Sequence, residues 1–205
     1  MKKIILFTVT ALLFSSNSFG QLIEISLKGG VCANSMSHKF DKIANYKAKG
    51  NLGYAAGLSG TVGFGGYRAG ISISALRVSA YLSPKFGVPM PDSLTHSLGN
   101  PLVPIEAMFI KRTKIAKISI DIGIMGGICV NNRYVNSYED GRTTTSNSAN
   151  TNWFTYGGIL SGQYNISKRL AVGIEAQPKW IRLKRGQTLD NTFLLPVMAK
   201  VSARL

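Results

Sequence analysis

Residues 51–64 have the sequence NLGYAAGLSGTVGF, in which large apolar residues alternate with small or polar ones. The apolar members at every second position are Leu52, Tyr54, Ala56, Leu58, Val62 and Phe64. Because successive side chains of a β-strand point to opposite faces, this pattern predicts a strand with one apolar face. Helical periodicity is scarce after residue 21, so we expect an all-β protein.

The same alternation recurs along the chain and predicts eight strands. They lie at residues 22–33, 51–64, 68–82, 101–110, 117–130, 152–166, 170–183 and 192–205. In the third strand the apolar set changes phase, so that Leu76, Val78 and Ala80 continue the face begun by Ile71 and Ile73. This change of phase predicts a β-bulge near residues 75 and 76.

The predicted connections alternate in length. Short ones follow the second, fourth and sixth strands, at residues 65–67, 111–116 and 167–169. Longer ones follow the odd-numbered strands, at residues 34–50, 83–100, 131–151 and 184–191. Outer-membrane barrels have this rhythm, and hydrocarbon tolerates strands only in a closed sheet. We therefore predict an eight-stranded antiparallel up-and-down transmembrane β-barrel over residues 21–205.

The first twenty residues have the features of a signal peptide. Lys2 and Lys3 precede an apolar run, Ile4 to Phe14, and Ser18 and Gly20 fit a small-residue cleavage site. The run is shorter than the roughly 20 residues that a membrane-spanning helix needs. We expect cleavage after residue 20, export, and insertion into the bacterial outer membrane.

Two short motifs and the order of the segments carry a family resemblance. The motifs are LKGGV at residues 27–31 and VPIE at residues 103–106. With the alternation of long and short connections, they resemble the outer membrane β-barrel domain family of Bacteroidota, also called PorT-like. The resemblance implies an eight-stranded barrel of the general OmpA/OmpX shape, mostly without an assigned activity.

Charged residues fall on the predicted inner face of several strands. They are Glu24, Lys28, Arg77, Glu106, Asp121, Glu175, Lys179, Lys200 and Arg204. Unpaired charge in a narrow lumen is costly, so we expect these acids and bases to pair and plug the barrel. An ion path or gate is the alternative.

The chain is basic, with a formal net charge of +15, which favours polyanionic neighbours. Lys39, Lys42, Lys47 and Lys49 in the first long connection could contact lipopolysaccharide or another surface polyanion. A generally basic surface without a ligand is equally compatible with this charge. The short turns also carry basic residues, for which a solvated rim is the preferred interpretation: Arg68, Lys111, Arg112, Lys114, Lys117, Lys168 and Arg169.

The remaining candidate residues indicate structure rather than chemistry. Cys32 and Cys129 fall on opposite strands of the predicted ring, so two buried free thiols are expected, with a bridge across a flattened mouth as the alternative. His38 and His96 lack the further ligands of a metal site, and no cofactor is expected. Aromatic residues toward the strand ends could form interfacial girdles: Tyr54, Tyr67, Tyr81, Trp153, Phe154, Tyr156 and Trp180.

These features predict a structural or partner-binding role through the long outer loops. A binding module for surface polyanions is the main alternative, followed by a narrow channel and a lipid-modifying enzyme. No nucleophile with a visible base partner is found, so enzymatic activity is not expected. The expected partners are outer-membrane lipid and the outer-membrane assembly machinery, with lipopolysaccharide and an unidentified protein as further candidates, and no nucleic acid.

Overall fold

The computed structural model describes residues 22–35, 46–64, 66–84, 94–130, 133–138, 142–147, 153–185 and 188–205. The predicted signal peptide, Lys39 and Lys42 lie outside these residues. The regular elements of the described part are β-strands. A helix with the length and apolar character needed to cross a membrane is not found there.

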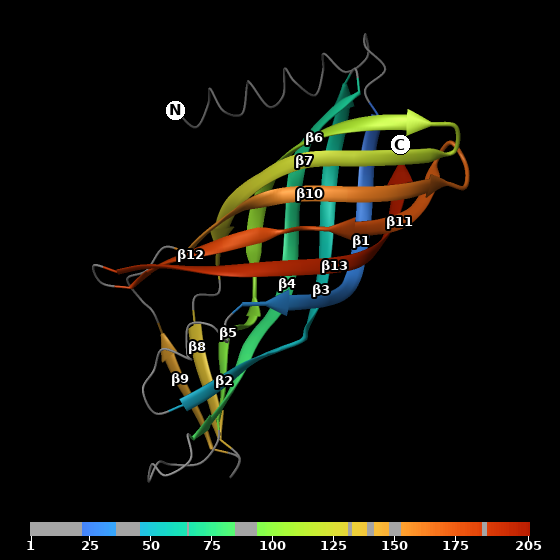
Figure 1. Ribbon diagram of the computed structural model, residues 1–205. Helices are drawn as coiled ribbons and strands as arrows, with labels where there is room; N and C mark the ends of the chain where they lie inside the picture. The colour runs from blue at the N-terminus through green and yellow to red at the C-terminus, as the bar shows by residue number, and fades with distance from the viewer. Residues whose placement is uncertain are drawn as a thin grey trace, which may run out of the picture.

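Thirteen strands make up the described part of the chain (Figure 1). They are β1 (Leu22–Asn34), β2 (Tyr46–Asn51), β3 (Gly53–Phe64), β4 (Tyr67–Pro84), β5 (Leu94–Leu102), β6 (Pro104–Ile115), β7 (Ile118–Cys129), β8 (Arg133–Tyr138), β9 (Thr143–Asn147), β10 (Trp153–Asn165), β11 (Leu170–Ala176), β12 (Lys179–Arg185) and β13 (Thr188–Arg204).

Eight strand positions close into a barrel. The antiparallel order runs β3, β1, β13, β11, β10, β7, β6 and β4, and β4 pairs again with β3. β12 continues the line of β11, because it also pairs with β10 and β13. The predicted closed eight-stranded antiparallel barrel is confirmed.

The strand predicted at residues 170–183 is interrupted between β11 and β12. Proline has no N–H to donate to the ladder, and Pro178 lies in the gap. The neighbouring groups are nevertheless paired: the N–H of Gly158 donates to the Pro178 carbonyl at 2.8 Å, and that of Gln177 to the Pro196 carbonyl at 3.0 Å. The barrel wall therefore stays closed across the interruption.

The same sheet extends beyond one end of the barrel (Figure 1). We call this extension the outer sheet and define it as β2, β5, β8, β9 and the last part of β4. β4 has 18 residues, and its last part pairs with β2 and β5. β8 then pairs with β5, and β9 with β8. The prediction of loops at residues 34–50, 83–100 and 131–151 was wrong where these strands form. Their polar sequences lack the alternation by which the barrel strands were found.

The outward face of the barrel is apolar, and its interior is filled. On β7, Ile122 and Ile124 face outward with 61% and 68% of their surface exposed, whereas Ser119 and Asp121 are buried inside. The interior is polar toward the short turns and apolar toward the outer sheet. The apolar layer consists of Cys32, Ala55, Leu76, Val78, Ala80, Leu102, Cys129, Trp153, Ile181, Leu194 and Met198.

The predicted change of phase in the third strand was wrong. Leu76 and Val78 are buried on the same inner face as Ser72 and Ser74, so β4 keeps its alternation of buried and exposed residues through residue 78. The apolar residues move from the outer to the inner face because the interior itself changes from polar to apolar along the barrel. The register does shift between Leu76 and Val78, but the extra residues belong to the facing strand β5.

Some glycines allow neighbouring strands to approach closely. Comparing alanine substitutions at a crowded and an uncrowded glycine tests this close packing. A Cβ added to Gly70 would lie 2.1 Å from the Gly60 carbonyl oxygen, whereas one added to Gly60 would meet nothing within 4 Å. We predict that Gly70→Ala lowers the free energy of unfolding by about 1–3 kcal/mol. Gly60→Ala should change it by less than about 0.5 kcal/mol. Urea unfolding of the barrel in detergent micelles measures both, and equal effects would contradict the close packing.

Candidate functional site: the charged interior

Arg112 joins two acidic side chains at the centre of the polar interior. Its Nη1 and Nη2 donate to the two carboxylate oxygens of Glu24 at 2.6 and 3.0 Å. Its Nε and Nη2 donate to the two oxygens of Asp121 at 2.6 and 2.7 Å. Such two-point contacts between a guanidinium and a carboxylate are among the stronger and more directional pairs in proteins. β1, β6 and β7 are thereby connected through the lumen.

Three further cations surround the Glu24 carboxylate. The Nε of Arg204 donates to it at 2.9 Å. The Nη2 of Arg68 lies 3.7 Å and the Nζ of Lys200 3.9 Å from its oxygens. All of these side chains are buried. Glu24 is thus held by four cations from three other strands, β4, β6 and β13.

A second centre forms around Glu175 on β11. Lys28 donates to Glu175 at 2.6 Å, and the Nζ of Lys200 lies 3.1 Å from it. The Gln177 amide donates to the same carboxylate at 2.6 Å. Lys200 also lies within 3.9 Å of Asp121, so this centre continues into the first one.

Lys179 and Glu106 form a separate pair beside the apolar layer. The Lys179 Nζ donates to Glu106 Oε2 at 2.6 Å, and both side chains are fully buried. The other oxygen, Oε1, has no partner among the described residues. A charge in such surroundings is tolerated only when it is paired, so each of these residues depends on the other.

The structure places eight of the nine predicted inner charges in the lumen, and corrects one. Glu24, Lys28, Glu106, Asp121, Glu175, Lys179, Lys200 and Arg204 are buried there. Arg77 is exposed on the outward face. The prediction that it faces the lumen was wrong because it depended on the change of phase that β4 does not make.

Two interior residues were misplaced by the sequence reasoning. Arg68 and Arg112 were assigned to a solvated basic rim, but both are buried and paired inside. The predicted fourth strand ended at Ile110, whereas β6 continues to Ile115. Counting on in steps of two from Glu106 and Met108 would have placed Arg112 on the inner face.

The other candidate residues divide between the interior and the surface. Cys32 and Cys129 are buried and unbridged. Lys49 is exposed on β2, and Lys47 lies on the same strand. Within the described part of the chain, no group of three His, Cys, Asp or Glu residues could hold a metal ion.

Exposed aromatic residues gather near the ends of the barrel strands. Tyr67 stacks on Phe109 with 5.7 Å between ring centroids, and Tyr156 stacks on Trp180 at 5.8 Å. Trp153 was predicted to join such a girdle, which was wrong. It is 1% exposed because it lies at an inward position of β10 and packs in the apolar layer.

The contacts of Arg112 predict a large effect on stability. Arg112→Met leaves Glu24 and Asp121 without their strongest partner, so we expect unfolding to become easier by about 3–5 kcal/mol. Arg77→Met, on the outward face, removes the same charge and should leave stability unchanged or raised. The measurement is the urea midpoint in micelles. Adding Glu24→Gln and Asp121→Asn to Arg112→Met should restore part of the lost stability. If the expectations for Arg112→Met, Arg77→Met and this triple variant all failed, the central role of Arg112 in the network would be contradicted.

Comparisons with known proteins bear on the fold. No protein-family model and no curated protein matches the chain. Among solved structures, neisserial surface protein A (NspA) of Neisseria has 13% identity, with 91% of this chain and 97% of that chain covered and a TM-score of 0.52. Ail of Yersinia pestis, in complex with the heparin analogue sucrose octasulfate, has 11% identity, 89% and 99% coverage and a TM-score of 0.45. The outer membrane protein OprG of Pseudomonas aeruginosa has 10% identity, 90% and 95% coverage and a TM-score of 0.39.

The resemblance to PorT-like proteins remains a prediction, because these comparisons do not test it. The similarity to NspA covers nearly the whole of both chains and agrees with the observed strand pairing. This chain therefore has the fold of an eight-stranded outer membrane β-barrel.

Proposed function

We propose that this chain is an outer membrane barrel with an occluded lumen, which acts through structural support or partner binding at its outer sheet. One observation carries the proposal: the described inward side chains form a polar and an apolar layer that are almost completely buried, while β4 continues beyond the barrel as the base of the outer sheet. The accessible surface for recognition is then at the outer end. The proposed role is non-enzymatic.

The outward face of the barrel supports membrane insertion. Its exposed side chains are largely Ile, Leu and Val, from every strand position of the barrel. Large exposed apolar surfaces are rare on soluble proteins, and a barrel in lipid requires one. The stacked aromatic pairs at the strand ends fit the interfacial regions of a bilayer.

The filled lumen argues against conduction. The polar layer contains carboxylates held by several cations each, and the apolar layer contains Leu76, Leu102 and Trp153 with almost no exposed surface. Eight strands enclose a space that side chains can fill. In this proposal the inner charges do not form an ion path; they pair with one another and block the lumen.

The outer sheet offers a surface that is polar and has free edges. β9 (TTTSN) pairs with β8, and in the described part of the chain its other edge has no neighbouring strand. Ser137, Arg142 and Thr143 are exposed there. Exposed strand edges can accept a strand from another protein, and polar side chains limit nonspecific association.

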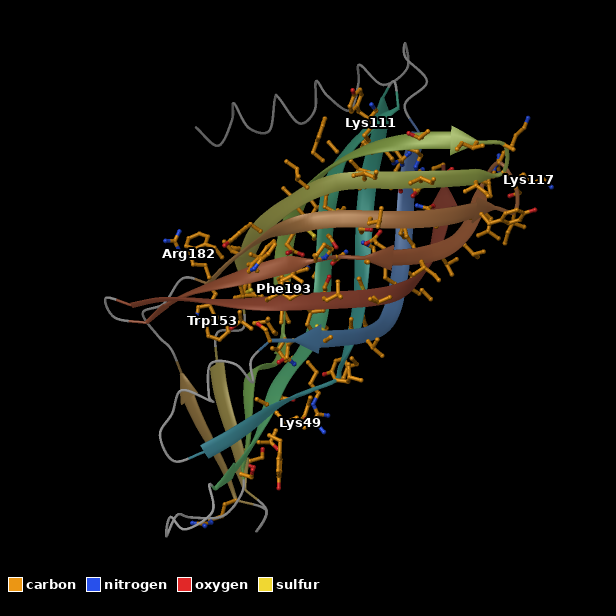
Figure 2. All side chains as sticks on the ribbon, viewed as in Figure 1. Lys49, Lys111, Lys117, Trp153, Arg182 and Phe193 are labelled. Atoms are coloured by element: carbon orange, nitrogen blue, oxygen red, sulfur yellow. The ribbon has the colours of Figure 1, made fainter. Side chains whose placement is uncertain are left out.

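Binding of a surface polyanion is the second candidate. The observation that favours it is the position of Lys49 on β2, exposed at the outer sheet rather than against the barrel wall (Figure 2). Lys47 belongs to the same short strand, and the whole chain carries an excess of positive charge. Lysines at this end would attract the phosphates of lipopolysaccharide.

A photo-crosslinking experiment separates these candidates. A benzophenone amino acid is placed at Ser137 or Thr143 on the outer sheet, with Ile122 on the barrel wall as the matched control. The proposal predicts a discrete protein adduct from the outer-sheet positions and only lipid adducts from Ile122. Adducts with lipopolysaccharide at the outer sheet would favour the second candidate. The same products from all three positions would contradict a specific role for the outer sheet.

A further inference from the structure

A basic groove lies at the end of the barrel opposite the outer sheet. It has a volume of about 540 Å³ and is formed by the β6–β7 turn, the β10–β11 turn and the end of β13. Its polar lining comes from Lys114, Lys117, Asn165, Ser167, Lys168 and Arg204. Figure 2 shows Lys117 at the tip of the β6–β7 hairpin, where this groove begins.

The charge around the groove is of one sign. Among the described residues that line it, four are cationic and none is acidic. None of the nine acidic residues of the sequence falls in the turns at this end, at residues 65–66, 111–117 and 166–169. The polar layer behind the groove adds to the excess, because three carboxylates there face five cations: Glu24, Asp121 and Glu175 against Lys28, Arg68, Arg112, Lys200 and Arg204.

Arg204 provides an observation independent of surface charge. It is 5% exposed, and its Nε donates to Glu24 at 2.9 Å. Its Nη2 is buried and has no hydrogen-bond partner in the described part of the chain. A buried donor without an acceptor is unfavourable, and Arg204 is one of the residues that line the groove. An anion in the groove would lower the energy of this group.

The walls of the groove are fixed before any ligand arrives. The backbone and side-chain N–H groups of Asn165 donate to the Lys117 carbonyl at 2.7 and 2.8 Å, which joins the two turns. The Ser167 hydroxyl oxygen accepts the N–H groups of Arg169 and Leu170 at 3.2 and 3.0 Å. The hydroxyl proton of Ser167 is then still available to donate to a ligand.

Neighbouring aromatic residues place the groove at the level of lipid headgroups. The Lys117 Nζ lies 6.0 Å from the centre of the Tyr164 ring, and Tyr164 is 49% exposed on the outward face. Tyr67 and Phe109 stack at the same end of the barrel. Tyrosines in such girdles lie at the membrane–water interface, and lysines extend from there toward the phosphates.

We propose that this groove binds a phosphate group, through Lys114, Lys168 and Arg204 with a hydrogen bond from Ser167. The phosphate belongs either to free inorganic phosphate or to a phospholipid headgroup in the leaflet that faces the short turns. Lysine ammonium groups and a guanidinium are the cations that proteins use for phosphate. The groove lies at the end opposite the outer sheet, so phosphate binding in the groove is tested independently of partner binding at the outer sheet.

The test uses the folded chain in alkyl maltoside micelles, which contain no phosphate. Inorganic phosphate is titrated while NMR follows the amide signals of Asn165, Ser167 and Lys168. The proposal predicts saturable shifts at these residues, weakened by added salt. Shifts that are absent, or that lie elsewhere on the barrel, would overturn the proposal. This titration uses the unsubstituted chain, so it does not depend on the folding of any variant.

A pair of matched double variants locates the site. Lys114→Gln with Lys168→Gln removes two groove cations, and we expect phosphate binding to weaken about tenfold. Lys111→Gln with Arg169→Gln removes the same charge from exposed residues of the same end that do not line the groove, and should change binding less than about twofold. Equal weakening in both variants would reduce the effect to general charge and overturn the proposal.

A second ligand distinguishes the source of the phosphate. Dihexanoyl phosphatidylglycerol, below its micelle concentration, is titrated under the same conditions. Tighter binding than inorganic phosphate, with displacement of it, assigns the groove to a lipid headgroup. Equal or weaker binding assigns it to free phosphate. Either result supports a phosphate site, provided that the Lys114 and Lys168 variant loses it.

Discussion

The structure depends on one constraint: a strand surrounded by hydrocarbon must have every backbone N–H and C=O paired within the sheet. The pairing of β4 with β3 closes the ring and leaves no free edge in the barrel wall. The same constraint explains the local repair at Pro178, where the Gly158 and Gln177 N–H groups find carbonyls in place of the ladder. Once the ring is closed, the outward side chains that meet hydrocarbon must be apolar, and charged residues at that level can be placed only inside.

The paired charges inside the barrel limit the functions that the barrel can have. Arg112 holds Glu24 and Asp121, and Lys200 connects them to Glu175, so the interior charges support one another and fill the space. Toward the outer sheet, apolar residues complete the filling. Since these side chains occupy the middle of the barrel, the recognition that we propose uses its two ends. One end carries the outer sheet, and the other carries a groove of single charge sign.

Much of this could be predicted from the sequence because a strand with one face in lipid imposes alternation on its residues. The eight barrel strands and most inner charges follow from that period of two. The outer sheet could not be found in this way, since strands such as β9 (TTTSN) are polar throughout and show no alternation. Leu76 was assumed to face lipid because it is apolar, which turned Arg77 inward. The interior toward the outer sheet is itself apolar, so Leu76 lies inside and Arg77 outside. Arg112 was missed because β6 continues further into the turn than its apolar residues indicate.

The central claim is that apolar side chains face lipid and the polar ones are enclosed. It is tested most directly by nitroxide labels on single cysteines along β7 and β10, in a Cys32→Ser, Cys129→Ser background reconstituted in liposomes. The account predicts frequent collisions with dissolved oxygen at Ile120, Ile122 and Leu160, and infrequent collisions at Ser119 and Ser161. The opposite alternation, or equal collision rates at neighbouring positions, would contradict it.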